Sequence, residues 1–161
     1  REIADSVRES VRIVVLCVDL DAESVREILK LVNPDVLQFH GEEEDAFYAS
    51  FGKPYWKAVP ITAGDSLPRA TAAYPSAEAL LVDTPSTRVP GGTGEVFDWS
   101  LIPVPSPARI LLAGGLDPTN VAEAIRAVQP FGVDVASGVE YPRGVKSHCR
   151  IRAFLEAANG A

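Results

Sequence analysis

The sequence contains no methionine and only two cysteines and two histidines among its 161 residues. Cys17 and Cys149 lie far apart and form no Cys-x-x-Cys pair, so the usual spacing of a metal site is missing and we expect neither a metal nor another cofactor. A signal peptide is also missing, and with so few cysteines a reducing cytoplasm is the expected compartment. The longest apolar runs are too short to span a bilayer, so no membrane partner is expected.

Positive charge is scarce as well. Lys and Arg together number 15 against 22 Asp and Glu, which gives a net charge of −7 and a pI near 4.8. Because a nucleic-acid surface needs clustered positive charge, this balance argues against a nucleic-acid partner. It does not argue against a phosphate ligand, since backbone N–H groups bind phosphate locally.

The chain opens on Arg1, inside a predicted helix over residues 1–11, where a natural start would give Met or the entry to a strand. We therefore expect the amino-terminal part of the protein to be missing from this sequence. The length and a hydrophobic fraction of 47% predict a single domain over residues 1–161.

Short apolar runs rich in β-branched residues recur along the chain. Each is apolar on both faces, as expected for strands buried on both sides of a parallel sheet. The predicted strands are residues 13–18, 36–39, 56–59, 79–82, 110–113 and 133–136.

Amphipathic segments lie between these runs. Residues 21–29 and 148–158 are predicted helices with one apolar face, and Asp117 is predicted to cap a third helix with Pro118 in its first turn. The alternation predicts right-handed βαβ units in an α/β fold. A doubly wound sheet and a (β/α)8 barrel (a TIM barrel) lacking its first two strands both fit this order.

Polar and glycine residues follow several different predicted strands at the point where each ends. They are His40-Gly41, Asp83-Thr84, the glycines of 91–94, Gly114-Gly115 and Ser137-Gly138. A ring of such loops converging on one mouth is the barrel arrangement, whereas a doubly wound sheet concentrates them at one switch point. Their distribution favours the barrel.

Asp83 is the first catalytic candidate because it is a lone acid that ends the run 79–82. One interpretation is a general acid or base at a strand end, partly desolvated so that its pKa moves toward neutrality. The other is an Asp that caps a turn through Thr84 and Pro85.

Three glycine loops follow the later strands and are predicted to bind phosphate. The loops after the last strands of a barrel often form a phosphate site together with a helix amino terminus. The candidate residues are Gly92, Gly94, Gly114, Gly115, Ser137 and Gly138.

Three further residues have two interpretations each. Asp134 lies within an apolar run, where a charge is costly unless it is paired or used, so it either faces the mouth to bind a ligand hydroxyl or pairs with a core cation. His40 either lines the site or is a structural hydrogen-bonding group, the reading we favour. Cys17 is either a nucleophile or a buried, inert thiol, and the lack of a base nearby in sequence favours the second interpretation.

Five segments together resemble the phosphoribosylanthranilate isomerase family of tryptophan biosynthesis, and the resemblance covers essentially the whole chain. The glycine-rich GGTGEVFDW segment and VDVASGVE are its most specific parts. The matching segments are 34–43 (PDVLQFHGEE), 80–84 (LLVDT), 91–101 (GGTGEVFDWSL), 112–121 (LAGGLDPTNV) and 133–140 (VDVASGVE).

The resemblance implies a (β/α)8 barrel, here lacking its first two strands and first helix, and an Amadori rearrangement of a phosphorylated aminoaldose to an aminoketose. A general acid protonates the ring oxygen and a general base removes the proton at C2. The family's acid corresponds to Asp83. The partner implied is a small phosphorylated molecule, and the protein is expected to be a monomer or a homodimer.

The chain departs from the family pattern in two places. The family's base is a Cys in a Lys-Ile-Cys-Gly motif, which this sequence does not contain, and the family's arginine for the anthranilate carboxylate is missing too. We therefore expect these residues alone to be inactive. The alternative to an isomerase is a catalytically incomplete barrel that binds phosphate or acts as a scaffold.

Overall fold

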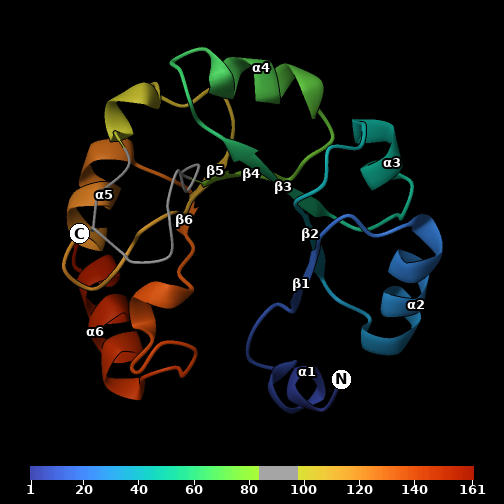
Figure 1. The fold of residues 1–161 in the computed structure, drawn as a ribbon, viewed down its shortest axis with the longest axis horizontal. Coiled ribbons are helices and arrows are strands. Elements are labelled where there is room, and N and C mark those ends of the chain that lie inside the picture. Colours follow the sequence, from blue (N-terminus) through green and yellow to red (C-terminus); the bar gives the residue numbers. More distant parts are fainter. Residues whose placement is uncertain (84–97) are drawn as a thin grey trace.

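Six parallel strands form the centre of the computed structural model, which describes residues 1–83 and 98–161. They lie side by side in chain order and curl into a half-barrel with β1 and β6 at its two edges (Figure 1). This sequential order decides for the (β/α)8 type of sheet, because a doubly wound sheet reverses direction at a switch point. The strands are β1 (Val14–Cys17), β2 (Val36–Phe39), β3 (Tyr55–Pro60), β4 (Ala79–Asp83), β5 (Ile110–Leu112) and β6 (Gly132–Val133).

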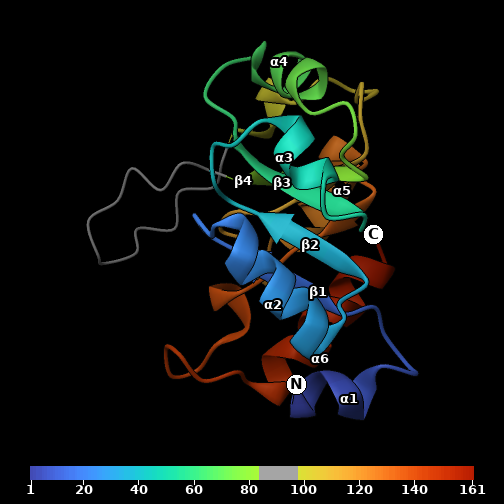
Figure 2. The same ribbon diagram turned by 90° about the vertical axis from the view of Figure 1, so that its right-hand side faces the viewer.

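The connecting helices lie round the outside of the curled sheet (Figure 1). Figure 2 shows α2 and α3 on the outer side of β1 and β2. None of the helices in the described ranges is long and apolar enough to cross a membrane. The helices are α1 (Glu2–Val7), α2 (Ala22–Val32), α3 (Asp45–Ala49), α4 (Ser66–Ala73), α5 (Val121–Val128) and α6 (His148–Asn159), with short 3-10 turns η1 (Trp99–Leu101) and η2 (Ser137–Val139).

The central strands are apolar on both faces because each face packs against a different layer. The outer face joins the helices in one cluster, to which Leu80, Leu112 and Phe154 belong. The inner face forms a separate cluster that includes Leu81 and Leu111. Successive residues of a strand alternate between these faces, so the strand-end residue Asp83 lies on the inner side with Leu81.

Strand β1 is not buried on both sides, contrary to the sequence prediction. Cys17 is buried against α2 and β2. On the other face Val14, Leu16 and Val18 are exposed, and Leu16 is 54% exposed. The reason is that β1 is an edge strand, so within the described residues no further strand covers its inner face.

Several predicted boundaries are also wrong. The first helix ends at Val7 rather than at residue 11, and β6 spans two residues instead of 133–136. Asp117 does not cap α5, which begins at Val121 after Asn120. Instead, Asp117 Oδ1 accepts a hydrogen bond from the backbone N–H of Thr119 at 2.7 Å, and so closes a turn before the helix.

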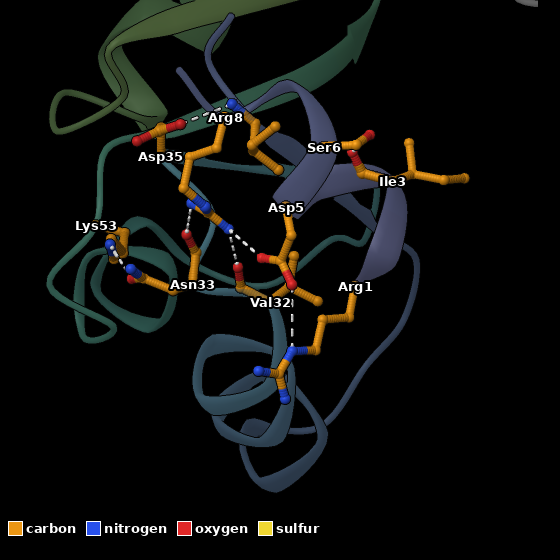
Figure 3. A network of polar contacts seen from close by, with 10 residues as sticks. Arg1, Ile3, Asp5, Ser6, Arg8, Val32, Asn33, Asp35 and Lys53 are labelled. Atoms are coloured by element: carbon orange, nitrogen blue, oxygen red, sulfur yellow. Dashed lines mark hydrogen bonds and ion pairs between the residues drawn. The ribbon is translucent and has the colours of Figure 1, made fainter. Parts of the chain in front are cut away.

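Helix α1 is attached to the rest of the molecule through Arg8. Its guanidinium donates to the carbonyl oxygens of Val32 (2.6 Å) and Asn33 (2.9 Å), at the carboxyl end of α2 (Figure 3). A cation there satisfies carbonyl groups that the helix leaves unpaired and complements the helix dipole. At the start of α2, Asp21 caps the helix as a side-chain acceptor for Ser24 N–H at 2.8 Å.

Candidate active site

The carboxyl ends of the strands form one edge of the half-barrel, and the loops that follow them carry the predicted site residues. We call this edge the mouth. Asp83 is the last residue of β4 and is half-buried on the inner side. Asp134 follows β6, and its backbone N–H donates to the carbonyl of Leu112 at 2.8 Å, which continues the ladder and turns its side chain inward.

His40 follows β2 on the same inner side. Its backbone N–H donates to the carbonyl of Cys17 at 3.0 Å, and its ring Nε2 lies 3.3 Å from Oε1 of Gln38. The structure therefore brings strand-end residues of β2, β4 and β6 to a common edge, and gives the His40 ring a hydrogen-bonding partner as well.

Three titratable side chains at the mouth influence one another. Burial lowers the pKa of His40, while the nearby charges of Asp83 and Asp134 oppose this shift. Burial raises the pKa of Asp134, the charge of Asp83 raises it further, and His40 and Lys146 oppose the rise. Asp134 remains accessible to solvent, so its raised pKa comes from the groups that surround it at the mouth and not from full enclosure in the core. Carboxyl groups and an imidazole are among the side chains that act as general acids and bases.

The glycine loops after β5 and β6 pack directly against each other. A Cβ atom at Gly138 would lie 1.9 Å from the carbonyl oxygen of Leu116, so only glycine fits there. Gly115 has a φ of +67° in the left-handed region, and its carbonyl accepts a hydrogen bond from Asn120 Nδ2 at 2.9 Å. Gly114 adopts a φ of +80° beside it.

Backbone donors at these loops are available for a ligand. Within residues 1–83 and 98–161, the N–H groups of Gly115, Ser137 and Gly138 donate no hydrogen bond. Such unpaired N–H groups are the usual ligands of a phosphate. Gly92 and Gly94, the other predicted phosphate ligands, lie outside the described residues.

Two residues at or near the mouth were not predicted from the sequence. Lys146 lies in the loop after β6 and pairs with Glu140 at 3.0 Å. The turn-forming sequence between them (Tyr-Pro-Arg-Gly-Val) is a signal for a short hairpin, but it does not indicate that the lysine folds back onto the strand end.

Lys57 is buried but does not belong to the inner face. Its side chain lies in the helix layer, with its ammonium 5.1 Å from the ring centre of Tyr74 and 6.0 Å from that of Tyr48. Burial lowers the pKa of Lys57. Among the described residues, its one hydrogen bond goes to the carbonyl of Ala58, at 2.6 Å.

The cysteines lie away from the mouth. Cys17 is buried in the cluster under α2, where burial raises the pKa of its thiol, and Cys149 is exposed on α6. The described residues hold no group of three or more His, Cys, Asp or Glu side chains arranged for a metal ion.

A surface cavity of about 470 Å³ lies at the opposite end of the strands. It is lined by residues 104–110, which lead into β5, and by residues 128–131, which follow α5. It therefore lies near the amino ends of β5 and β6 and shares no residue with the mouth. Arg109 lies over the ring of Phe131 beside it, 5.0 Å from the ring centre.

Comparison with known proteins identifies the family. Residues 1–157 match the family model described as N-(5'phosphoribosyl)anthranilate (PRA) isomerase. N-(5'-phosphoribosyl)anthranilate isomerase of Pseudomonas fluorescens strain Pf0-1 is 48% identical over 157 residues, which are 98% of this chain and 77% of that protein. The enzyme of strain SBW25 is 46% identical over 161 residues, which are all of this chain and 77% of that protein.

Solved structures agree. Phosphoribosyl anthranilate isomerase from Thermotoga maritima superposes with a TM-score of 0.86 at 34% identity, and covers 99% of this chain and 78% of the other. A second isomerase structure, in complex with reduced 1-(o-carboxyphenylamino)-1-deoxyribulose 5-phosphate, gives a TM-score of 0.79 at 31% identity, with 99% and 79% coverage. The sequential parallel sheet, the residues at its mouth and these similarities lead to one conclusion: the chain belongs to the phosphoribosylanthranilate isomerase family.

Proposed function

We propose that the mouth binds N-(5-phosphoribosyl)anthranilate and that Asp83 is the general acid of its isomerisation. The reaction converts an aminoaldose to an aminoketose, so the ring oxygen gains a proton while C2 loses one. The single observation that carries the proposal is the placement of Asp83 on the inner side of the mouth, close enough to Asp134 and His40 for their charges to interact.

Asp134 and the two glycine loops have binding roles in this proposal. The N–H groups of Gly115, Ser137 and Gly138 would hold the phosphate, together with Gly92, Gly94 and Gly114. Asp134 would accept a hydrogen bond from a sugar hydroxyl, and His40 would line the same space. The substrate is thus a small phosphorylated molecule. Its backbone ligands explain how a protein of net charge −7 binds an anion.

The test is the Asp83→Asn variant in the full-length protein. Loss of a general acid costs about 10²- to 10⁴-fold in turnover, whereas binding of reduced 1-(o-carboxyphenylamino)-1-deoxyribulose 5-phosphate should change little. Turnover is followed by the loss of fluorescence of the anthranilate-bearing substrate. Asp5→Asn on α1, an equal change outside the sheet, is the control. Near-normal turnover in Asp83→Asn would contradict the assignment.

A further inference from the structure

The loop that follows β6, residues 136–147, is closed on itself by one lysine. Lys146 Nζ donates to the carbonyl of Ala136 at 2.6 Å and pairs with Oε1 of Glu140 at 3.0 Å. The other carboxylate oxygen of Glu140 accepts a hydrogen bond from the backbone N–H of Gly144 at 2.8 Å. Lys146 and Glu140 therefore tie the beginning of the loop to its end, and we call this pair the brace.

Backbone contacts extend the same arrangement. Glu140 and Lys146 form an antiparallel bridge, the N–H of Tyr141 donates to the carbonyl of Val145 at 2.8 Å, and Ser147 N–H donates to Val139 at 2.9 Å. The loop is thus a hairpin. Residues 137 and 138 lie at its base, after the end of β6.

The brace lies next to the proposed phosphate ligands. Ala136, whose carbonyl Lys146 contacts, directly precedes Ser137 and Gly138. On the other side, Arg150 of α6 donates from Nη1 to the carbonyl of Gly138 at 3.3 Å. Carbonyl groups on both sides of the Ser137 and Gly138 N–H groups are thereby held by cations, and neither N–H group donates to another described residue.

We propose that Lys146 and Glu140 are positioning residues that hold the Ser137–Gly138 backbone in a phosphate-binding conformation. The inference rests on the proposed phosphate site and deepens it. Neither side chain need touch the ligand, because the effect passes through the carbonyl of Ala136 and the hairpin.

The role of Glu140 separates this proposal from simple electrostatic attraction. If Lys146 acted only as a nearby positive charge, then removing the negative charge of Glu140 would strengthen anion binding. If the pair holds the loop, then Glu140→Gln weakens anion binding, because Lys146 loses its partner and Gly144 N–H loses a charged acceptor. The two readings predict changes of opposite sign.

The experiment measures the dissociation constant of inorganic phosphate for the protein and three variants. Lys146→Met and Glu140→Gln each break the brace. Arg143→Met is the matched control, since it removes one positive charge from the same hairpin but makes no hydrogen bond in the described structure. Hydrogen exchange of the amides in residues 136–147 is recorded in parallel.

We expect Lys146→Met and Glu140→Gln each to weaken phosphate binding about three- to fivefold, the size of a partly exposed ion pair, and to speed exchange in residues 136–147. Arg143→Met should do neither. If the unmodified protein binds phosphate but Glu140→Gln binds it equally or more tightly, the brace proposal alone is wrong. If the unmodified protein binds no phosphate, the phosphate site itself is wrong and the brace has no role in it.

Discussion

Two carboxylates at opposite ends of the same sheet, Glu78 and Asp134, have opposite surroundings. At the amino ends of the strands, Glu78 accepts hydrogen bonds from Arg12 at 3.2 and 3.1 Å and from the indole of Trp56 at 3.0 Å. The hydrogen bond from Arg12 is the main cause of a lowered pKa for Glu78. At the mouth, Asp134 makes no hydrogen bond or ion pair with the described residues, and burial raises its pKa.

This difference is the one expected if the mouth, as proposed, carries the chemistry and the opposite end contributes to stability. The Arg12–Glu78 pair joins residues that precede β1 and β4 and so connects distant strands across the floor of the half-barrel. A carboxyl group left without partners contributes nothing comparable to stability, but its proton and lone pairs are available to a substrate. Barrel enzymes as a class divide the two ends of their strands in this way.

The largest expected effect comes from closing the gap between the two glycine loops. Gly138→Val would place side-chain carbon against the Leu116 carbonyl and displace the Ser137–Gly138 backbone. We expect phosphate binding to weaken by at least about tenfold, because charged hydrogen bonds from the backbone are lost. Titration with inorganic phosphate measures this.

If Gly138→Val does not fold, Gly115→Ala tests the same site. The Cβ of the alanine would meet no atom within 4 Å, so the change acts only through the φ of +67°, which is strained for alanine. Unchanged phosphate affinity in a folded variant of either residue would contradict the phosphate site.

Substitution at the amino ends of the strands should change stability and not binding. Glu78→Gln removes the charge that Arg12 contacts, and since both side chains are partly exposed we expect a loss of about 1 kcal/mol in the free energy of unfolding. Phosphate affinity should be unchanged. Urea denaturation measures the stability, with Glu27→Gln on the exposed side of α2 as the control. A Glu78→Gln variant that loses phosphate binding while keeping its stability would show that Glu78 serves binding and not stability.

Substitution of Asp134 at the mouth should change the free energy of unfolding in the opposite direction. Asp134→Asn removes a carboxylate that burial and Asp83 disfavour, so at neutral pH we expect the free energy of unfolding to rise, by less than about 1 kcal/mol because the group is open to solvent. Binding of the reduced product analogue should weaken in the same variant. Destabilisation by Asp134→Asn would show that this carboxylate has a structural partner.

The smallest effect is the pH dependence of these two contributions. The folded pKa of Glu78 lies below its ordinary value of 4.5, so its stabilisation is present above that value and is lost as the pH falls through the folded pKa. For Asp134, whose folded pKa lies above 3.8, the contribution is favourable at low pH and is lost as the pH rises through the folded pKa. Unfolding curves between about pH 3 and 7 should lose the first dependence in Glu78→Gln and the second in Asp134→Asn.

The sequence was sufficient to predict the type of sheet, since apolar runs alternating with amphipathic segments imply βαβ units and the strand-end polar residues favour a barrel. It was misleading for β1, because an apolar edge strand looks the same in sequence as a central one. Asp117 and Pro118 look like a helix start, but the hydrogen bonds of Asp117 and Asn120 form a turn there instead.

The candidate site was predictable only where its residues follow strands directly. Asp83 and His40 could be placed from the ends of apolar runs, and Asp134 was noticed as a charge within such a run. The contact of Gly138 with Leu116 depends on how two loops approach each other, and the contact of Lys146 with Ala136 depends on a hairpin that reverses the chain. Neither has a periodic pattern in the sequence.

The most direct test of the account is to map the binding of reduced 1-(o-carboxyphenylamino)-1-deoxyribulose 5-phosphate by backbone amide chemical shifts. We expect the shifts to concentrate after β2, β4, β5 and β6, at His40, Gly115, Asp134 and the Ser137–Gly138 pair. Shifts confined to the cavity beside Arg109 and Phe131, at the other end of the strands, would contradict the assignment of the mouth as the active site.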